Sequence, residues 1–322
     1  MSYPALNAVR ISISPWIYIY FLFGLIFFLR TEILASSVRA TCETQPKESL
    51  KQLNTAQLPK YSPGSWNHIT NLTHLKYSSS INPAKIWGGN KQTTSWMCGY
   101  SFSVHVPEAF NASKSAYPLI IFLHGGLTSQ EQHLRYLGKA FYASADDPYI
   151  LVMPKKQEWD WNPNKLKDVI ELLASKIPID PKRIYLTGLS MGGRGTFIVA
   201  ASLPDLFAAL MPLSPHHAPY SYIPLAPQIA HLPIWISHGD ADRVSKFDSA
   251  KKMFQTLKNA GSPVHFRAIS GGTHCCWKKI YGNKTTMEWF LNQQNNRRTA
   301  VKTKTWGSIK SQNNTIKKNL KN

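Results

Sequence analysis

The chain has 322 residues, 43% of them hydrophobic, and a formal net charge of +20 at neutral pH. This length accommodates one large domain or two small ones, and the apolar content is typical of a globular protein with a sizeable core. Part of the excess charge lies in residues 296–322, which hold eight Lys and Arg and no acid. A basic surface favours acidic polymers, anionic membranes or nucleic acid. An excess of basic residues also arises when the whole proteome is rich in Lys, so we expect no specific nucleic-acid partner.

The amino terminus has the pattern of a targeting segment. Arg10 precedes an apolar run over residues 16–29, and small residues follow, with Ala35 and Ala40 as candidate cleavage positions. A positive region, an apolar region and a small-residue site are typical of a secretory signal peptide. The alternative is an uncleaved anchor, since the run approaches the ~20 residues that span a bilayer. Residues 1–40 are therefore predicted to be a signal peptide or a membrane anchor, and the protein to be secreted or periplasmic. The protein is expected to contact a membrane only if this segment is not cleaved.

Four cysteines follow this segment: Cys42, Cys98, Cys275 and Cys276. An even number in an exported chain is compatible with disulfides, and four cysteines allow three pairings. A bond from Cys98 to Cys275 or Cys276 would join the front of the domain to its end. No pair has the spacing of zinc ligands, so we expect no structural metal.

The elements predicted in chain order alternate between strands and helices. Residues 41–99 form a polar lead-in, and the basic tail 296–322 is predicted to be disordered. Phe102, Val104 and Val106 alternate with polar residues, the period of a half-buried strand. Further apolar strands are predicted over residues 118–123, 149–154, 184–189, 208–213, 232–237 and 264–269. Helices are predicted near residues 166–173, 196–202, 247–257 and 286–291. Between them, residues 158–162 are expected to form an exposed aromatic loop and residues 180–183 a turn.

Strands that alternate with helices imply a mostly parallel sheet with helices on both faces, an α/β fold. No repeat or Gly/Ser-rich linker interrupts residues 100–295, which we predict to be one domain.

A Gly-x-Ser-x-Gly sequence joins one of these strands to the following helix. Gly188 and Gly192 lack a Cβ, so strand and helix can pack closely while Ser190 projects at the tip of the turn. This context favours a nucleophile elbow over a chance match.

Three other predicted strands end in residues that can take part in the same chemistry: His124-Gly125-Gly126, Asp242 and His274. Ligands bind at the carboxyl ends of parallel strands, and the order serine, acid, histidine is that of a hydrolase sheet with a serine elbow. A serine hydroxyl needs a base, for which we select His274, and the base needs a carboxylate to orient it. Asp242 is preferred to Asp240 because the acid must reach back toward His274.

The negative charge that develops on the carbonyl oxygen during acyl transfer must be stabilised by backbone N–H donors. Met191 supplies one, and the turn at residues 124–126 supplies another. His124 is expected to shape this turn, His216 and His217 to line the pocket, and His238 to be structural.

Four motifs together resemble the α/β-hydrolase superfamily: His-Gly-Gly at 124–126, Gly-Leu-Ser-Met-Gly-Gly at 188–193, His-Gly-Asp-x-Asp-x-Val at 238–244 and Gly-Gly-Thr-His-x-x-Trp at 271–277. Within it they resemble the dienelactone hydrolase, phospholipase/carboxylesterase and polyhydroxybutyrate-depolymerase-like esterases, the predicted peptidase group. The resemblance covers about residues 100–295. It implies Ser190 as nucleophile, Asp242 as acid, His274 as base, an oxyanion N–H at Gly126 and no cofactor. The sequence departs from the pattern at Ser245, where relatives commonly have Pro, and at Cys275-Cys276.

The predicted function is therefore an exported serine hydrolase that cleaves small-molecule or polymeric carboxylic esters. A serine peptidase of the same fold is one alternative, and a non-catalytic polymer- or carbohydrate-binding protein is another. A third reading is a membrane- or nucleic-acid-associated module. Four aromatic residues are candidates for lining an aromatic cleft: Trp159, Trp161, Tyr220 and Tyr222. The substrate and the oligomeric state stay open.

Overall fold

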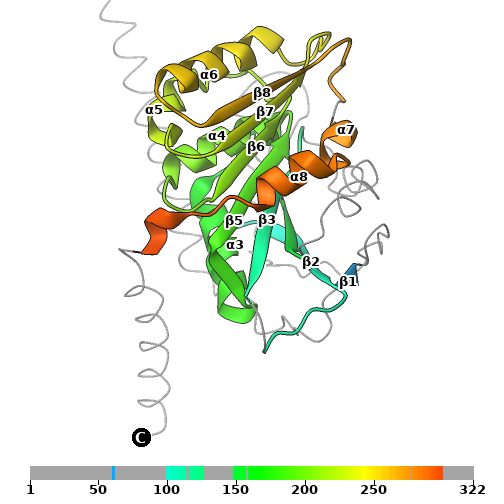
Figure 1. Cartoon of the computed structure of the whole chain (residues 1–322), viewed down its shortest axis with the longest axis vertical. Helices are drawn as coiled ribbons and strands as arrows, with labels where there is room; N and C mark the ends of the chain where they lie inside the picture. Colours follow the sequence, from blue (N-terminus) through cyan, green and yellow to red (C-terminus); the bar gives the residue numbers. More distant parts are fainter. Residues whose placement is uncertain are drawn as a thin grey trace, which may run out of the picture. The chain divides into compact units, whose positions relative to one another are not determined.

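The computed structural model describes residues 60–61, 99–113, 116–126, 148–156, 159–275 and 277–299 (Figure 1). The predicted signal segment, Cys42, Cys98, Cys276 and residues 300–322 lie outside the described residues. Of the predicted tail, Asn296–Thr299 form a 3-10 helix, η4.

The core of the fold is a sheet of eight strands in the order β1-β2-β4-β3-β5-β6-β7-β8. The strands are β1 (Lys60–Tyr61), β2 (Ser101–Pro107), β3 (Tyr117–Leu123), β4 (Ile150–Lys155), β5 (Ile179–Leu189), β6 (Ala209–Leu213), β7 (Ile234–Gly239) and β8 (Val264–Ile269). Only β2 and β4 pair antiparallel; all other neighbouring pairs are parallel. The predicted, mostly parallel sheet is confirmed.

Helices cover both faces of this sheet. They are α3 (Pro163–Lys176), α4 (Met191–Ser202), α5 (Ala226–Ile229), α6 (Phe247–Asn259), α7 (Trp277–Tyr281) and α8 (Lys284–Leu291), with a 3-10 turn, η3, at Ile223–Leu225. Side chains of α3 to α6 pack in one apolar cluster and those of α7 and α8 in a second. The two clusters divide β3, since Leu119 and Ile121 belong to the first and Ile120 and Phe122 to the second. Continuous apolar runs such as this one arise because parallel strands are buried on both faces.

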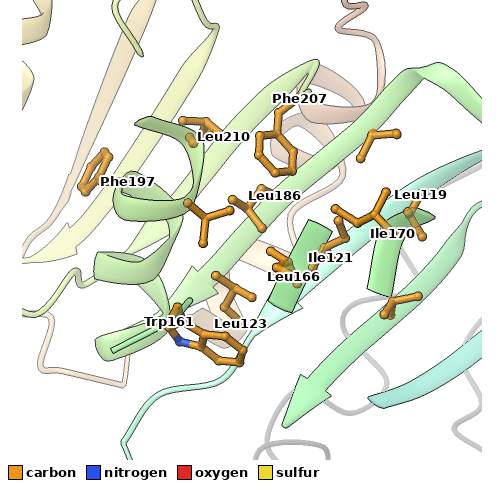
Figure 2. Close-up of a cluster of buried hydrophobic side chains, with 14 of the residues drawn as sticks. Leu119, Ile121, Leu123, Trp161, Leu166, Ile170, Leu186, Phe197, Phe207 and Leu210 are labelled. Carbon is orange, nitrogen blue, oxygen red and sulfur yellow. The ribbon is translucent and has the colours of Figure 1, made fainter. Parts of the chain in front are cut away.

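The first cluster contains Trp161, which the sequence analysis placed in an exposed loop (Figure 2). That prediction is wrong, because Trp161 is only 1% exposed. Its ring meets Tyr100 edge-on at 5.3 Å between centroids. A Cβ at position 195 would lie 2.2 Å from the Trp161 ring, so Gly195 provides the space that the indole occupies.

Two other local predictions are also corrected. Strand β2 is not half-buried: Ser103 and His105 are as inaccessible to solvent as their apolar neighbours, so side chains on both faces of this inner strand are buried. Residues 180–183 are not a turn that precedes the elbow strand, because they lie inside β5, where the register against β3 shifts. The turn signal has a local basis, since Asp180 Oδ1 accepts a hydrogen bond from the backbone N–H of Lys182 at 2.9 Å.

Within the described ranges, no helix is both long and apolar enough to cross a membrane.

The burial of His105 generates a prediction about pH. Burial lowers the pKa of His105 to about 3, whereas the unfolded chain protonates this group near its usual pKa of ~6.5. The unfolded state therefore binds more protons between these values, and the free energy of unfolding falls as the pH decreases from 6.5 toward 3. Between pH 7 and pH 4.5, His105→Leu should therefore lose about 2 kcal/mol less of its free energy of unfolding than the wild type. Urea unfolding at the two pH values measures this difference. His265→Leu, an exposed position on β8, is the control. An equal pH dependence in wild type and His105→Leu would contradict the prediction.

Candidate active site

Ser190 occupies a strained turn between β5 and α4. Its backbone angles are φ 55° and ψ −115°, a region that residues other than glycine rarely adopt. Three backbone hydrogen bonds hold it: its N–H donates to Leu213 O at 2.9 Å, and its carbonyl accepts from Arg194 N at 3.0 Å and His216 N at 2.9 Å. The chain around the turn thus maintains a conformation that Ser190 alone would not favour.

The two flanking glycines are required by close backbone contacts. A Cβ on Gly192 would lie 1.9 Å from Leu123 O, and one on Gly188 would lie 2.6 Å from Gly192 O. Because these obstacles are backbone atoms, no rotamer change relieves them. The sharp strand-to-helix turn expected from the sequence is confirmed.

Backbone donors lie beside this serine. Met191 is the first residue of α4, so its N–H has no acceptor within the helix and lies at the positive end of the helix dipole. Gly125 lies close to Ser190, since a Cβ on Gly125 would be 3.0 Å from Ser190 Cβ. The next residue, Gly126, has a positive φ of 57°. The turn at the end of β3 and the start of α4 therefore border the same hydroxyl.

Asp242 and His274 form a hydrogen-bonded pair. His274 Nδ1 lies 2.8 Å from Asp242 Oδ2, and the other carboxylate oxygen accepts from the N–H groups of Val244 at 2.8 Å and Ser245 at 2.9 Å. Burial by itself raises the pKa of Asp242, but the hydrogen bonds from His274 and the two N–H groups outweigh it and hold the pKa below its usual value. The carboxylate is therefore ionised at neutral pH.

Asp240 has a different partner. Its Oδ1 accepts from Gly271 N at 2.7 Å, so it joins the loop after β7 to the loop that carries His274. Of the two candidate acids, the structure pairs Asp242 with the histidine.

Ser190, Asp242 and His274 follow β5, β7 and β8 respectively, at the carboxyl edge of the sheet. Within the described residues, no hydrogen bond joins Ser190 Oγ to His274. Since Nδ1 of His274 is engaged by Asp242, Nε2 is the ring nitrogen that remains for another hydrogen bond. Catalytic hydrogen bonds are often long in the absence of substrate.

The remaining candidate histidines have local contacts. His124 Nε2 accepts from Lys156 N at 3.2 Å, which joins the turn after β3 to the end of β4. The rings of His216 and His217 stack at 4.9 Å, and His217 Nδ1 accepts from Lys246 N at 3.3 Å. These two histidines therefore link the loop after β6 to the loop after β7, residues 240–246, which carries Asp242 and is called the acid loop below.

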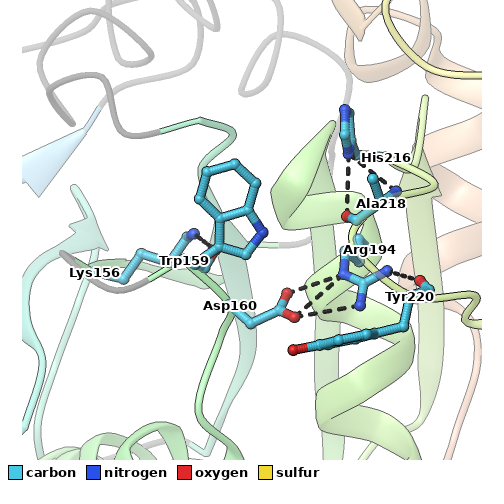
Figure 3. Close-up of polar contacts among 7 residues, drawn as sticks. All are labelled: Lys156, Trp159, Asp160, Arg194, His216, Ala218 and Tyr220. Carbon is cyan, nitrogen blue, oxygen red and sulfur yellow. Dashed lines mark hydrogen bonds and ion pairs between the residues drawn. The ribbon is translucent and has the colours of Figure 1, made fainter. Parts of the chain in front are cut away.

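A buried ion pair that the sequence analysis did not identify lies one helical turn from Ser190. Arg194 is 2% exposed and donates to both carboxylate oxygens of Asp160, at 3.0 and 3.3 Å. It also donates to Tyr220 O, and its guanidinium lies 5.4 Å from the centre of the Tyr220 ring (Figure 3). Arg194 thus ties the loops after β4 and β6 to α4. The signal in the sequence is a single charge inside an otherwise uncharged helix.

The four candidate aromatic residues divide into two groups. Trp161 and Tyr222 are buried in the core, whereas Trp159 is 47% and Tyr220 70% exposed. In the described part of the chain, the exposed large hydrophobic residues are these two and Val244. All three lie in loops at the carboxyl edge of the sheet, and Lys156 Nζ donates to Trp159 O at 2.5 Å.

Cys275 carries a free, exposed thiol. The part of the chain that is described contains no cluster of three His, Cys, Asp or Glu side chains able to hold a metal ion.

The mostly parallel sheet, the glycine-flanked serine at a strand-to-helix turn and the acid and histidine after later strands define an α/β-hydrolase fold. Residues 86–297 match the dienelactone hydrolase family, and the chain belongs to this family.

Curated relatives include poly(3-hydroxyalkanoate) depolymerase C of Paucimonas lemoignei, 27% identical over 34% of this chain and 30% of the relative. A bifunctional acetylxylan esterase/xylanase of Neocallimastix patriciarum is 26% identical over 52% of this chain and 25% of the relative. The chain therefore spans less than a third of the length of either protein. Among solved structures, a thermostable esterase superposes with a TM-score of 0.52 at 25% identity, covering 61% of this chain and 59% of that one.

The Arg194–Asp160 pair generates a stability prediction. Arg194→Met leaves the Asp160 carboxylate, which is 28% exposed, without its counter-ion and releases two loops from α4. We expect the free energy of unfolding to fall by about 2–3 kcal/mol, less than for a fully buried pair, as measured by chemical denaturation. Lys167→Met removes an exposed pair with Glu171 and should cost less than about 0.5 kcal/mol. Equal effects of the two variants would refute a structural role for the buried pair.

Proposed function

We propose that this protein is an exported carboxylic ester hydrolase in which Ser190 is the nucleophile, His274 the base and Asp242 the acid. The observation that carries the proposal is the 2.8 Å pair between His274 Nδ1 and Asp242 Oδ2, at the same edge of the sheet as a serine held in a strained turn. An ionised carboxylate beside the imidazole supports this assignment, since it keeps the proton on Nδ1 and stabilises the imidazolium that forms.

In the first half of the reaction, His274 Nε2 takes the hydroxyl proton as Ser190 Oγ forms a bond to the acyl carbon. The carbonyl oxygen becomes an alkoxide, which accepts hydrogen bonds from the N–H groups of Met191 and Gly126. The bond from the acyl carbon to the alcohol oxygen then breaks, and His274 delivers its proton to the departing alkoxide. The products of this half are a free alcohol and an acyl ester on Ser190.

In the second half, His274 removes a proton from water while the water oxygen attacks the acyl carbon. The second tetrahedral alkoxide collapses, the bond to Ser190 Oγ breaks, and the serine regains a proton from His274. The carboxylic acid is released and the protein returns to its starting state, so that no further reactant is consumed.

Esters are favoured over peptides because the matched family is a hydrolase family and the curated relatives named above are a depolymerase of a polyester and an esterase of acetylxylan. Both names refer to polymeric esters. The exposed Trp159 and Tyr220 rings supply apolar surface on which part of such a substrate can pack.

The triad is tested by Ser190→Ala, which we expect to lower kcat for 4-nitrophenyl acetate by at least about 10³-fold and to abolish labelling by a fluorophosphonate probe. Asp242→Asn should lower kcat by about 10³–10⁴-fold because the imidazole then takes the wrong tautomer. The matched control is Ser214→Ala, since Ser214 is also buried and has a positive φ of 41°; it should still be labelled.

Two results would argue against the proposal. Wild-type protein that resists the probe as Ser190→Ala does would favour a non-catalytic binding protein. Cleavage of peptide 4-nitroanilides without hydrolysis of 4-nitrophenyl or acetylxylan esters would favour a serine peptidase.

Export is tested separately, because the segment that directs it lies outside the described residues. In a secreting host, the mature protein should begin after Ala35 or Ala40, as read by N-terminal sequencing. Leu25→Arg places a charge in the apolar run and should retain the protein in the cell. An intact amino terminus on membrane-bound protein would indicate an anchor instead.

A further inference from the structure

A second histidine contacts the carboxylate of Asp242. His238, at the end of β7, has its Nε2 3.0 Å from Asp242 Oδ2 and 3.2 Å from Ser245 O. Asp242 Oδ2 therefore lies between two imidazoles, since His274 Nδ1 contacts the same oxygen at 2.8 Å. From the sequence, His238 was expected to have only a structural role.

The hydrogen-bonding pattern determines which nitrogen of His238 carries the proton. Both atoms near Nε2 are oxygens that only accept, so the proton lies on Nε2. Among the described residues, Nδ1 of His238 has no hydrogen-bond partner, as expected for the unprotonated nitrogen.

His238 is fully buried, and its ring meets the edge of Phe247 at 5.7 Å between centroids. The ionisable groups that act on it are Asp242 and His274. Burial is the largest effect and lowers the pKa of His238, so the ring is neutral when Asp242 is ionised. It thus contributes a hydrogen bond to the acid and no positive charge.

A buried hydrogen-bond acceptor without a partner, such as Nδ1 of His238 among the described residues, lowers stability. The imidazole must therefore provide an interaction that offsets this cost. Packing alone would be better served by an apolar side chain. The polar function that the ring performs is to join the acid loop to the sheet, because Ser245 donates its N–H to Asp242 and offers its carbonyl to His238.

We propose that His238 is a positioning residue of the hydrolytic site, which fixes Asp242 Oδ2 beside His274 and limits how strongly that carboxylate attracts the proton of His274. This inference rests on the proposed function. His238 touches neither the serine nor the substrate and acts only through Asp242. A neutral donor suits this role, since a charged one would cancel the negative charge that the imidazolium needs.

The test compares His238→Leu with His238→Gln. Leucine removes the donor, and we expect kcat to fall by about 10- to 100-fold with little change in KM, because a charge-assisted hydrogen bond is lost. With one donor fewer, Asp242 holds the imidazolium more strongly, so the acid limb of the kcat/KM profile should move up by roughly half a pH unit or more. Glutamine carries an amide N–H in reach of the same oxygen and should restore the wild-type acid limb and most of kcat.

Rates are divided by the fraction of protein that a fluorophosphonate titrates, so that partial unfolding does not count as lost catalysis. The matched control is His231→Leu, which removes a partly buried imidazole that lies away from the acid loop and contacts Pro204 O at 3.0 Å. This variant should leave kcat and the acid limb unchanged.

An unaltered acid limb in His238→Leu, or the same loss in the Leu and Gln variants, would overturn the positioning role. A wild-type protein that hydrolyses no ester would instead refute the proposed function, and the role of His238 with it.

Discussion

The contact between the start of α4 and the end of β3 is the constraint on which the site depends. Position 192 admits no side chain because Leu123 O occupies the space where a Cβ would lie. Strand β5 ends at Leu189 and α4 begins at Met191, so Ser190 alone connects them, and it takes a positive φ to do so. The turn after β3 also brings Gly125 close to Ser190, next to Met191 at the start of α4.

The helix that begins at this contact also organises the loops around the site. Arg194 extends from its first turns to Asp160 on one side and Tyr220 on the other. The ion pair is buried on the arginine side, where water competes little for the guanidinium. The position of α4 therefore determines both the conformation of Ser190 and the arrangement of the loops beside it.

On the other side of the site, the environment of Asp242 reflects a balance of opposing effects. Burial disfavours its charge, while four donors on its two oxygens favour it. Because the donors prevail, the carboxylate keeps its charge without contact with water and is held in one orientation. The end of β7 and the loop directly after it supply three of these donors, and the loop after β8, 32 residues beyond Asp242, supplies the fourth.

Much of the fold was predictable because burial on both faces leaves a strong apolar pattern. The strands over 118–123 and 264–269, the helix near 166–173 and the elbow at Ser190 agree with the structure to within a few residues. The errors have a common cause. His105 and Trp161 look like surface residues in their local sequence, yet both are buried in the fold. For Trp161 the space is provided by Gly195, which is distant in the chain.

The sequence by itself determined the class of sheet, the strained serine turn and the residue types available for acyl transfer, because strand period and glycine spacing are local properties. Only the tertiary structure decided which acid meets His274, since Asp240 and Asp242 differ by two positions in one loop and point to different partners. It alone brought His238 to the same carboxylate and Arg194 between two loops. The contacts of Arg194 and His274 depend on how strands β4 to β8 lie beside one another, whereas the contact of His238 spans four residues and depends on how the loop after β7 folds back.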